Sequence, residues 1–230
     1  MDNTIYESAS TLVTRSIWRD QKVVCKALKP AAQNPGAIAR YQHEFGINQS
    51  LTSPYVCRAL ALDERGVEIL FEDPGGESLH SVIAQRELSF DERMGIAVDL
   101  TRALQSVHDE GVIHRDLNPA NILVLDDPLR VCLIDFGLAT LIPREYPKSD
   151  QAGARTSTLP YLSPEQTGRV NRVVDYRTDL YSLGATLYEL FADHPPFTNT
   201  DPLELIHAQI ASTPKPLSTV NGKIPHWLSD

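Results

Sequence analysis

The sequence has few cysteines, and their spacing excludes the common cysteine-based sites. Only three occur in 230 residues, Cys25, Cys57 and Cys132, and they are far apart and odd in number. They form no CxxC pair, so neither a zinc motif nor a disulfide framework is indicated. Their apolar neighbours favour small buried side chains in strands, and this pattern suits a reducing compartment.

Long apolar runs and an excess of basic residues are also missing. No stretch approaches the roughly 20 apolar residues of a membrane-spanning helix, and the N-terminus does not have the pattern of a secretory signal. Lysine and arginine total 21 against 30 aspartates and glutamates, a net charge of -9. We therefore expect a cytoplasmic protein, without membrane insertion and without nucleic acid as a partner.

The composition that remains is typical of a globular protein, and the first third of the sequence predicts strands. Hydrophobic residues make up 42% of the chain, enough for a sizeable core. Arg19-Asp20 is a hairpin signal between two of the runs, and residues 36–51 suit one helix. The predicted strands are 11–18, 21–28, 55–62 and 66–71.

After residues 72–76, Glu-Asp-Pro-Gly-Gly, the pattern becomes helical, and we expect a hinge at this point. Ser89 and Glu92 have the spacing of a capping box, and Gly111 is placed to end the helix that follows. The apolar residues at helical spacing in this helix are Ala97, Leu100, Leu104 and Val107. The remaining predictions are strands at 122–125 and 130–134, a loop at 138–162, and helices at 178–191 and 202–211.

Residues 114–121, His-Arg-Asp-Leu-Asn-Pro-Ala-Asn, together with Asp-Phe-Gly at 135–137, carry the strongest chemical signal. Phosphoryl transfer requires that the phosphates are held, that metal ions place positive charge between them, and that the acceptor hydroxyl is oriented. Asp116 can accept the hydroxyl proton. Asn121 and Asp135 offer the hard oxygen ligands that Mg²⁺ prefers.

These two motifs resemble the HRD-x-x-x-x-N and DFG elements of the protein kinase family. The run Val-Val-Cys-Lys that ends at Lys26 resembles the family's V-A-I-K. The resemblance implies that Lys26 reaches the α- and β-phosphates of ATP and that Glu44 is the acid that holds it. It also places Val13 and Val24 beside the nucleotide, with Glu72 at the hinge.

A third group of motifs resembles the activation segment of Ser/Thr kinases. Ser-Pro-Glu ending at Glu165 is similar to A-P-E, and the element around Thr158 is similar to G-T-x-x-Y. The resemblance implies that Thr158 contacts Asp116, which favours Ser or Thr as the acceptor. Asp179 begins an element similar to D-x-W-S-x-G, so it is expected to cap the backbone of the catalytic loop, although a helix dipole also favours an acid there.

The resemblance also suggests regulation and a narrower relationship. Arg115 is expected to bind a phosphate on Thr156, Ser157 or Ser149. Residues 163–169 and 175–179 resemble the kinase domain that heads large bacterial signalling proteins. Those proteins continue with an ATPase-type module, a GAF domain and a histidine kinase, so downstream modules of a longer chain are possible partners.

The expected fold is therefore α+β and two-lobed, like a protein kinase. Residues 1–71 form a small antiparallel-sheet lobe with one helix, 72–76 the hinge, and 77–230 a mainly helical lobe. Because the family has further helices after this point, the second lobe is expected to be incomplete at its C-terminus. The expected activity is transfer of the ATP γ-phosphate, with Mg²⁺, to Ser/Thr hydroxyls of a protein substrate in bacterial-type signalling.

Two departures from the family, together with the expected incomplete second lobe, leave a second interpretation open. Tyr6, Ser8 and Thr11 occupy the positions of the glycine-rich loop, and Asn118 stands where Ser/Thr kinases have a lysine at the γ-phosphate. The alternative is a pseudokinase that binds nucleotide or a partner with little transfer. A small-molecule kinase would share the catalytic loop but lack the Ser-Pro-Glu element and the element at Asp179.

Overall fold

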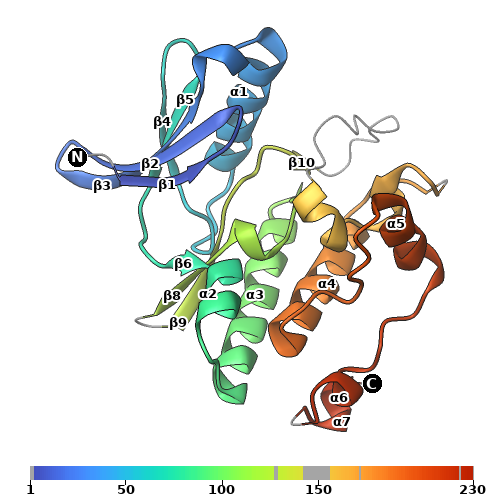
Figure 1. The fold of residues 1–230 in the computed structure, drawn as a ribbon. Coiled ribbons are helices and arrows are strands. Elements are labelled where there is room, and N and C mark those ends of the chain that lie inside the picture. Colours follow the sequence, from blue (N-terminus) through green and yellow to red (C-terminus); the bar gives the residue numbers. More distant parts are fainter. Residues whose placement is uncertain (1–2, 127–128, 142–155, 171, 223, 230) are drawn as a thin grey trace.

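The computed structural model describes residues 3–126, 129–141, 156–170, 172–222 and 224–229. They form the expected α+β fold: a five-stranded antiparallel sheet with one helix lies above a mainly helical part (Figure 1). The chain passes from the end of the sheet to the helical part through residues 72–76, here called the crossing segment. No helix in these ranges is long and apolar enough to span a membrane.

The five-stranded sheet has the strand order β1-β2-β3-β5-β4. The predicted hairpin turn at Arg19-Asp20 is confirmed, since both residues have positive φ, 51° and 62°, as the favoured two-residue hairpin turn requires. The strands are β1 (Asn3–Glu7), β2 (Thr11–Trp18), β3 (Gln21–Leu28), β4 (Ala59–Leu62) and β5 (Glu68–Glu72).

Helix α1 (Pro35–Ser50) packs on one face of this sheet. Asn34 caps it by accepting a hydrogen bond from the backbone N–H of Ala37 at 3.0 Å, and Pro35 occupies the first turn, where its missing N–H costs nothing. Tyr41 and Ala37 are buried against the sheet, while Ile47 near the end of the helix joins the core of the larger part. Helix α1 therefore contacts both parts of the molecule.

The larger part is built around two long helices and a small sheet. Its helices are α2 (Leu79–Gln85), α3 (Phe90–Asp109), α4 (Arg177–Ala192), α5 (Pro202–Ala211), α6 (Leu217–Val220) and α7 (His226–Ser229). Its strands are β6 (Glu77–Ser78), β7 (Val112–Ile113), β8 (Ile122–Asp126), β9 (Leu129–Leu133) and β10 (Thr140–Leu141), with pairings β6-β8-β9 and β7-β10. Three short 3₁₀ helices complete it: η2 (Pro119–Asn121), η3 (Thr156–Tyr161) and η4 (Pro164–Thr167).

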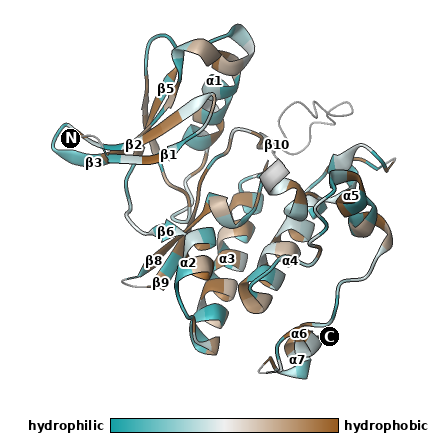
Figure 2. Ribbon diagram, in the orientation of Figure 1, coloured by the Kyte–Doolittle hydropathy of each residue, from teal (hydrophilic) through white to brown (hydrophobic). Residues whose placement is uncertain are grey.

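The buried apolar residues fall into two separate cores. One lies under the five-stranded sheet and includes Leu28, Ala59 and Ile69, and the other surrounds α3 and the β8-β9 hairpin. Hydrophobic residues concentrate along α3 and α4 in the middle of the larger part (Figure 2). The four apolar residues predicted to share one face of α3 are all buried, because helical spacing brings them together.

Several local predictions are confirmed and others are wrong. The capping box at the start of α3 is present, with Ser89 and Glu92 bonded reciprocally, and the helix at 202–211 has the predicted bounds. The strand expected at 55–62 is shorter, because its first residues form a loop against β9. The edge strand β1 was not predicted, since all five of its residues are exposed. The short helix α2 was not predicted either, although Leu79, Val82 and Ile83 lie at helical spacing and the first two are buried.

Gly76 fixes how the chain leaves the crossing segment. It has a φ of 76°, and a Cβ atom there would overlap the carbonyl oxygen of Val124 on β8. Glycine is the residue that tolerates both conditions. The close approach brings the crossing segment against the small sheet β6-β8-β9.

Candidate active site

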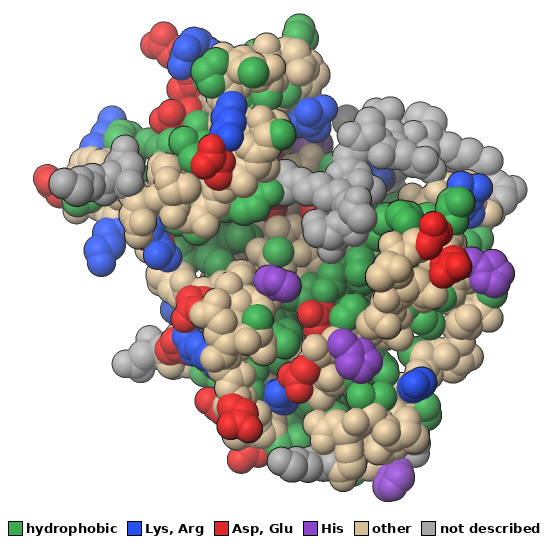
Figure 3. All heavy atoms as spheres, viewed as in Figure 1, with side chains coloured by type: hydrophobic (Ala, Val, Ile, Leu, Met, Phe, Trp, Pro, Cys, Tyr) green, Lys and Arg blue, Asp and Glu red, His purple; other side chains and the backbone are tan. Residues whose placement is uncertain are grey.

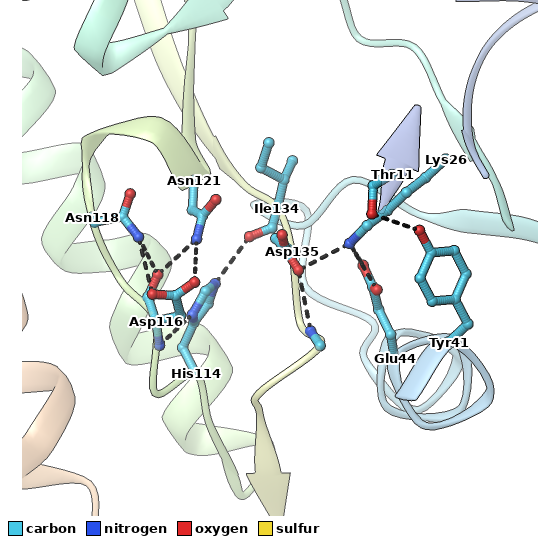
Figure 4. A network of polar contacts seen from close by, with 11 residues as sticks. Thr11, Lys26, Tyr41, Glu44, His114, Asp116, Asn118, Asn121, Ile134 and Asp135 are labelled. Atoms are coloured by element: carbon cyan, nitrogen blue, oxygen red, sulfur yellow. Dashed lines mark hydrogen bonds and ion pairs between the residues drawn. The ribbon is translucent and has the colours of Figure 1, made fainter. Parts of the chain in front are cut away.

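Lys26, on β3, is the centre of an ion-pair cluster in which Glu44 is buried and Lys26 and Asp135 are partly exposed. Its Nζ lies 2.8 Å from both carboxylate oxygens of Glu44 on α1 and 3.0 Å from Oδ1 of Asp135, which follows β9 (Figure 4). Tyr41 flanks the ammonium with its ring centroid at 5.7 Å. The pair expected from the sequence, Lys26 and Glu44, is therefore formed, and it includes an acid 109 positions further along the chain.

Burial and charge act against each other in this cluster. Burial opposes the charged form of Lys26, but the carboxylates of Asp135 and Glu44 outweigh it and raise its pKa. Burial raises the pKa of Glu44 to about 7, although Lys26 opposes the shift. Burial favours a higher pKa for Asp135 as well, but the charge of Lys26 outweighs burial and lowers that pKa. A proton entering the cluster therefore goes to Glu44 first.

Asp116 lies in the loop between β7 and β8, where two amides face its carboxylate. Asn121 Nδ2 donates to Asp116 Oδ2 at 3.0 Å and to its backbone oxygen at 2.8 Å. Asn118 Nδ2 donates to Asp116 Oδ1 at 3.2 Å and to the same backbone oxygen at 2.9 Å. These neutral donors orient the carboxylate while leaving it able to accept a proton.

Asp179, at the start of α4, is fully buried and holds the backbone of this loop. Its Oδ2 accepts hydrogen bonds from the backbone N–H of His114 and from His108 Nε2, and its Oδ1 accepts from the N–H of Arg115, at 2.7 to 2.8 Å. Arg115 has a φ of 65°, a strained region for a residue with a side chain. The carboxylate stabilises this strained turn immediately before Asp116.

His114 links the catalytic loop to the segment of Asp135. Its Nε2 lies 3.1 Å from the carbonyl oxygen of Ile134, which can only accept, so Nε2 carries the proton. Its Nδ1 accepts from the N–H of Asp116, and the ring packs on Phe136 with centroids 4.7 Å apart. Burial lowers the pKa of His114, which keeps the imidazole neutral and this arrangement fixed.

The oxygen atoms between the two halves of the site fit a hard metal ion. Among the described residues, Asp135 Oδ2 and Asn121 Oδ1 accept no hydrogen bond, while the remaining polar atoms of both side chains are bonded. Carboxylate and amide oxygens suit Mg²⁺, which takes its other ligands from water and phosphates. The described part of the chain has no group of three or more His, Cys, Asp or Glu that could hold a metal without such help.

Gly137 allows the close approach of this cluster. A Cβ atom at this position would lie 3.2 Å from Asp135 Oδ1 and 3.5 Å from Glu44 Oε2. The first of these distances is shorter than an ordinary van der Waals contact. The Gly137 N–H instead donates to Asp135 Oδ1 at 3.4 Å. Glycine after Phe136 therefore leaves room for the carboxylates around Lys26.

The positions of the missing glycine-rich loop have defined roles within the protein. The hydroxyl of Ser8 closes the turn between β1 and β2 by accepting from the backbone N–H groups of Ser10 and Thr11. The buried hydroxyl of Thr11 accepts from Tyr41 at 3.3 Å, and Tyr6 is 44% exposed on β1. The turn is thus held by side chains in place of glycine.

The remaining sequence-predicted nucleotide contacts lie on the sheet and the crossing segment. Val13 pairs with Lys26 across β2 and β3, Val24 lies two residues before Lys26 on the same strand face, and both are half-buried. Glu72 ends β5. Asn118 is turned toward Asp116, so both of its N–H groups are used within the loop.

The activation-segment residues divide between the described and undescribed parts. Glu165, in η4, accepts a hydrogen bond from Thr178 on α4 at 2.8 Å. Thr158 lies half-buried in η3, and its expected contact with Asp116 stays a prediction. Ser149 and the side chains of Thr156 and Ser157 lie outside the described residues, so the expected phosphate contact of Arg115 also stays a prediction.

Sequence reasoning missed two residues that connect the site. Gln166 Nε2 donates to the carbonyl oxygen of Arg115 at 2.7 Å, while its Oε1 accepts from the N–H and hydroxyl of Ser163. His43 Nε2 lies 2.7 Å from the carbonyl oxygen of Ala139 and joins α1 to the segment after Gly137. The Ser163–Gln166 spacing of a capping box was a readable signal for Gln166, whereas no local pattern indicates His43.

The sequence is similar to known proteins over nearly its whole length. Residues 7–229 match the family model described as the protein kinase domain. The chain is 31% identical over 212 residues to a probable serine/threonine-protein kinase of Clostridium perfringens, covering 90% of this chain and 30% of that protein. It is 31% identical over 187 residues to serine/threonine-protein kinase pkn2 of Myxococcus xanthus, covering 79% and 22%. It is 29% identical over 214 residues to serine/threonine-protein kinase PknB of Mycobacterium tuberculosis, covering 90% and 34%. The chain thus spans about a third or less of the length of these relatives.

Proposed function

Because this chain belongs to the protein kinase family, we propose that it transfers the γ-phosphate of ATP to Ser or Thr hydroxyls of a protein substrate. The observation that carries the proposal is the convergence of Lys26, Glu44 and Asp135 from three separate elements, with Asp116 in the adjoining loop. The names of the relatives, all serine/threonine-protein kinases, support the choice of acceptor.

Each polar group in this cluster has a proposed role. Lys26, kept protonated by its two carboxylate neighbours, binds the α- and β-phosphates, and Glu44 holds its ammonium in place. Asp116 accepts the proton of the attacking hydroxyl, in an orientation set by the Asn121 and Asn118 amides. Asp179 and Gln166 fix the backbone on either side of Arg115.

Asp135 and Asn121 are the proposed magnesium ligands. Their open oxygens belong to the two sides of the site, Asp135 beside Lys26 and Asn121 beside Asp116. Mg²⁺ bound there would supply positive charge to phosphate oxygens. Val13 and Val24 would offer apolar surface to the adenine base. Glu72 would offer backbone groups next to the base.

We further propose that the chain divides functionally at the crossing segment, with residues 1–71 as one lobe, 72–76 as hinge and 77–230 as the other. The two separate apolar cores support this division. Asp73 in the hinge accepts from Arg15 on β2 at 3.0 Å, which ties the segment to the sheet. Movement at the hinge would change the distance between Lys26 and Asp116.

The biological setting that we propose is bacterial-type signalling in the cytoplasm. The bacterial relatives, of which the chain covers only about a third or less, support an assignment to one module of a longer signalling protein. The elements at 163–169 and 175–179 favour the hybrid type, with ATPase-type, GAF and histidine kinase modules. Acidic and basic side chains are interspersed on the face shown in Figure 3, which fits a protein substrate better than nucleic acid.

The pseudokinase alternative is favoured by one specific observation. The amide of Asn118 is bonded to Asp116 at the position where the family has a lysine, so no positive charge comes from this residue. Electrostatic stabilisation of the transition state would then be weaker. ATP binding without transfer would identify this alternative.

The experiment incubates the chain with γ-labelled ATP, Mg²⁺ and a generic protein, and then identifies the labelled amino acids after acid hydrolysis. We expect phosphoserine and phosphothreonine, and loss of label in Lys26→Met and Asp116→Asn. Lys22→Met, at an exposed lysine of the same strand face, is the matched control and should keep activity. Label that persists in Asp116→Asn would contradict the assignment of the base.

A further inference from the structure

Cys57 and Cys132, which the sequence separates by 75 positions, lie side by side in the structure. Their sulfur atoms are 2.7 Å apart, and both side chains are buried, 6% and 5% exposed. The spacing of the cysteines in the sequence predicts separate apolar residues, and for this pair that prediction is incomplete. Nothing in the proposed kinase chemistry uses either thiol.

Backbone contacts around the pair fix the positions of the two sulfur atoms relative to each other. Val56 forms a parallel bridge with Leu133, the Cys57 N–H donates to the Leu133 carbonyl at 3.3 Å, and the Leu133 N–H donates to the Tyr55 carbonyl at 2.7 Å. The loop of Cys57 is also fixed to α1, because Asn48 Nδ2 donates to the Cys57 carbonyl at 2.9 Å. The two thiols are thus presented to each other by ordered backbone on both sides.

A cavity of about 300 Å³ reaches the pair. Cys57 and Cys132 both line it, together with Glu72 and Pro74 of the crossing segment. None of its lining residues belongs to the Lys26 cluster, and Glu72 is the one residue that it shares with the proposed ATP site. A buried thiol is ordinarily inert, but here a small oxidant can enter and a second thiol stands next to the first.

We infer that Cys57 and Cys132 form a covalent modification site that a small peroxide converts to an intrachain disulfide. One thiolate attacks the peroxide oxygen, the O–O bond breaks, and a sulfenic acid and water result. The second thiol then displaces the hydroxyl from that sulfur, which forms the S–S bond and releases a second water. Two thiols are oxidised and one hydrogen peroxide is reduced, so atoms and electrons balance.

The cross-link would join the segments that carry two members of the Lys26 cluster. Cys57 is bonded through Asn48 to α1, which bears Glu44, and Cys132 lies three residues before Asp135. Hydrogen bonding with Cys132, burial and nearby carboxylates raise the pKa of Cys57 well above its usual value. The reaction is therefore slower than that of an exposed thiol.

The test treats the reduced wild-type chain with hydrogen peroxide, blocks remaining thiols and maps the peptides without reduction. The expected product is one intrachain cross-link between the peptides of Cys57 and Cys132, reversed by dithiothreitol, with a Tm raised by about 5 °C or more. Cys25→Ser is the matched control and should form the same cross-link, while Cys57→Ser and Cys132→Ser should form none.

Because the wild-type peptide map identifies the pair directly, the result does not depend on the folding of the serine variants, and no kinase activity is needed. Two outcomes overturn the proposal. In one, Cys57 and Cys132 remain free thiols after Cys25 has reacted. In the other, they end as sulfinic acids without a cross-link. Wild-type protein oxidised in denaturant, where all pairings are accessible, shows whether the 57–132 pairing requires the fold.

Discussion

At the scale of single residues, the site is defined by the partners of its charged groups. Lys26 shares its ammonium between Glu44 and Asp135, and Asp116 is bonded by two neutral amides. The sequence motifs predicted which residue types would meet. They could not predict that Asn118 turns toward Asp116, because that depends on the backbone of η2, where Asn118 also accepts from the Ala120 N–H.

Glu44 should give the stability of the protein a recognisable pH dependence. Its pKa is about 7 in the folded chain against 4.5 without burial, so between these values the folded state binds the extra proton. Stability from this group therefore rises as pH falls through the window from about 7 to 4.5. Urea unfolding of wild type and Glu44→Gln should show wild type gaining relative stability toward the acid end.

Activity should follow the opposite trend in the same window. Protonation of Glu44 weakens its ion pair with Lys26, so phosphate transfer by wild type should fall as pH drops below about 7. The Glu44→Gln variant should start lower and lose less over this range. Identical pH profiles of transfer for the two proteins would contradict the assigned pKa shift.

Gln166 is predicted to act through the backbone of Arg115. Gln166→Glu replaces the donor to the Arg115 carbonyl with a carboxylate, which repels it, so kcat should fall about tenfold or more. The KM for ATP should change little, because the Lys26 cluster is not touched. Lowering the pH should partly restore kcat relative to wild type, since a protonated glutamate can donate again.

Gln85→Glu, at an exposed position at the end of α2, is the matched control for the charge change and should keep wild-type kcat. A Gln166→Glu protein with normal kcat at neutral pH would remove Gln166 from the positioning of the catalytic loop. A parallel loss of kcat and of ATP binding would indicate general disruption of the site instead.

At the scale of elements, local sequence signals were reliable where a cap or an amphipathic face was present. The β2-β3 hairpin, α1 and α3 follow from the Arg19-Asp20 turn, the apolar spacing and the capping box. β1 was missed because all five of its residues are exposed, and its place in the sheet comes from its pairing with β2. Tertiary pairing of this kind leaves no pattern in a single strand.

The capping box of α3 has a measurable share in stability. Ser89→Ala removes the hydroxyl that accepts from the Glu92 N–H and should lower the free energy of unfolding by about 1 kcal/mol. Ser89→Asp keeps an acceptor at the cap and should stay close to wild type. Denaturant unfolding of the three proteins measures the difference, and an equal loss in both variants would argue against the cap.

At the scale of the whole molecule, the sequence predicted the α+β architecture, the order of the longer helices and strands and the residues of the proposed site. The association of Cys57 with Cys132 and of Gln166 with Arg115 could not be predicted, because each joins segments far apart in the chain that only the folded structure brings together. Single long-range contacts of this kind carry no periodicity that a single sequence reveals.

The central claim is that Lys26, on the five-stranded sheet, and Asp135, which follows β9 in the larger part, form one nucleotide site. Titration calorimetry with ATP, with and without Mg²⁺, tests it most directly. We predict that wild type binds ATP more tightly with Mg²⁺, that Asp135→Asn loses this increment, and that Lys26→Met binds weakly in both conditions. Wild-type ATP binding that neither Mg²⁺ nor either substitution alters would contradict the claim.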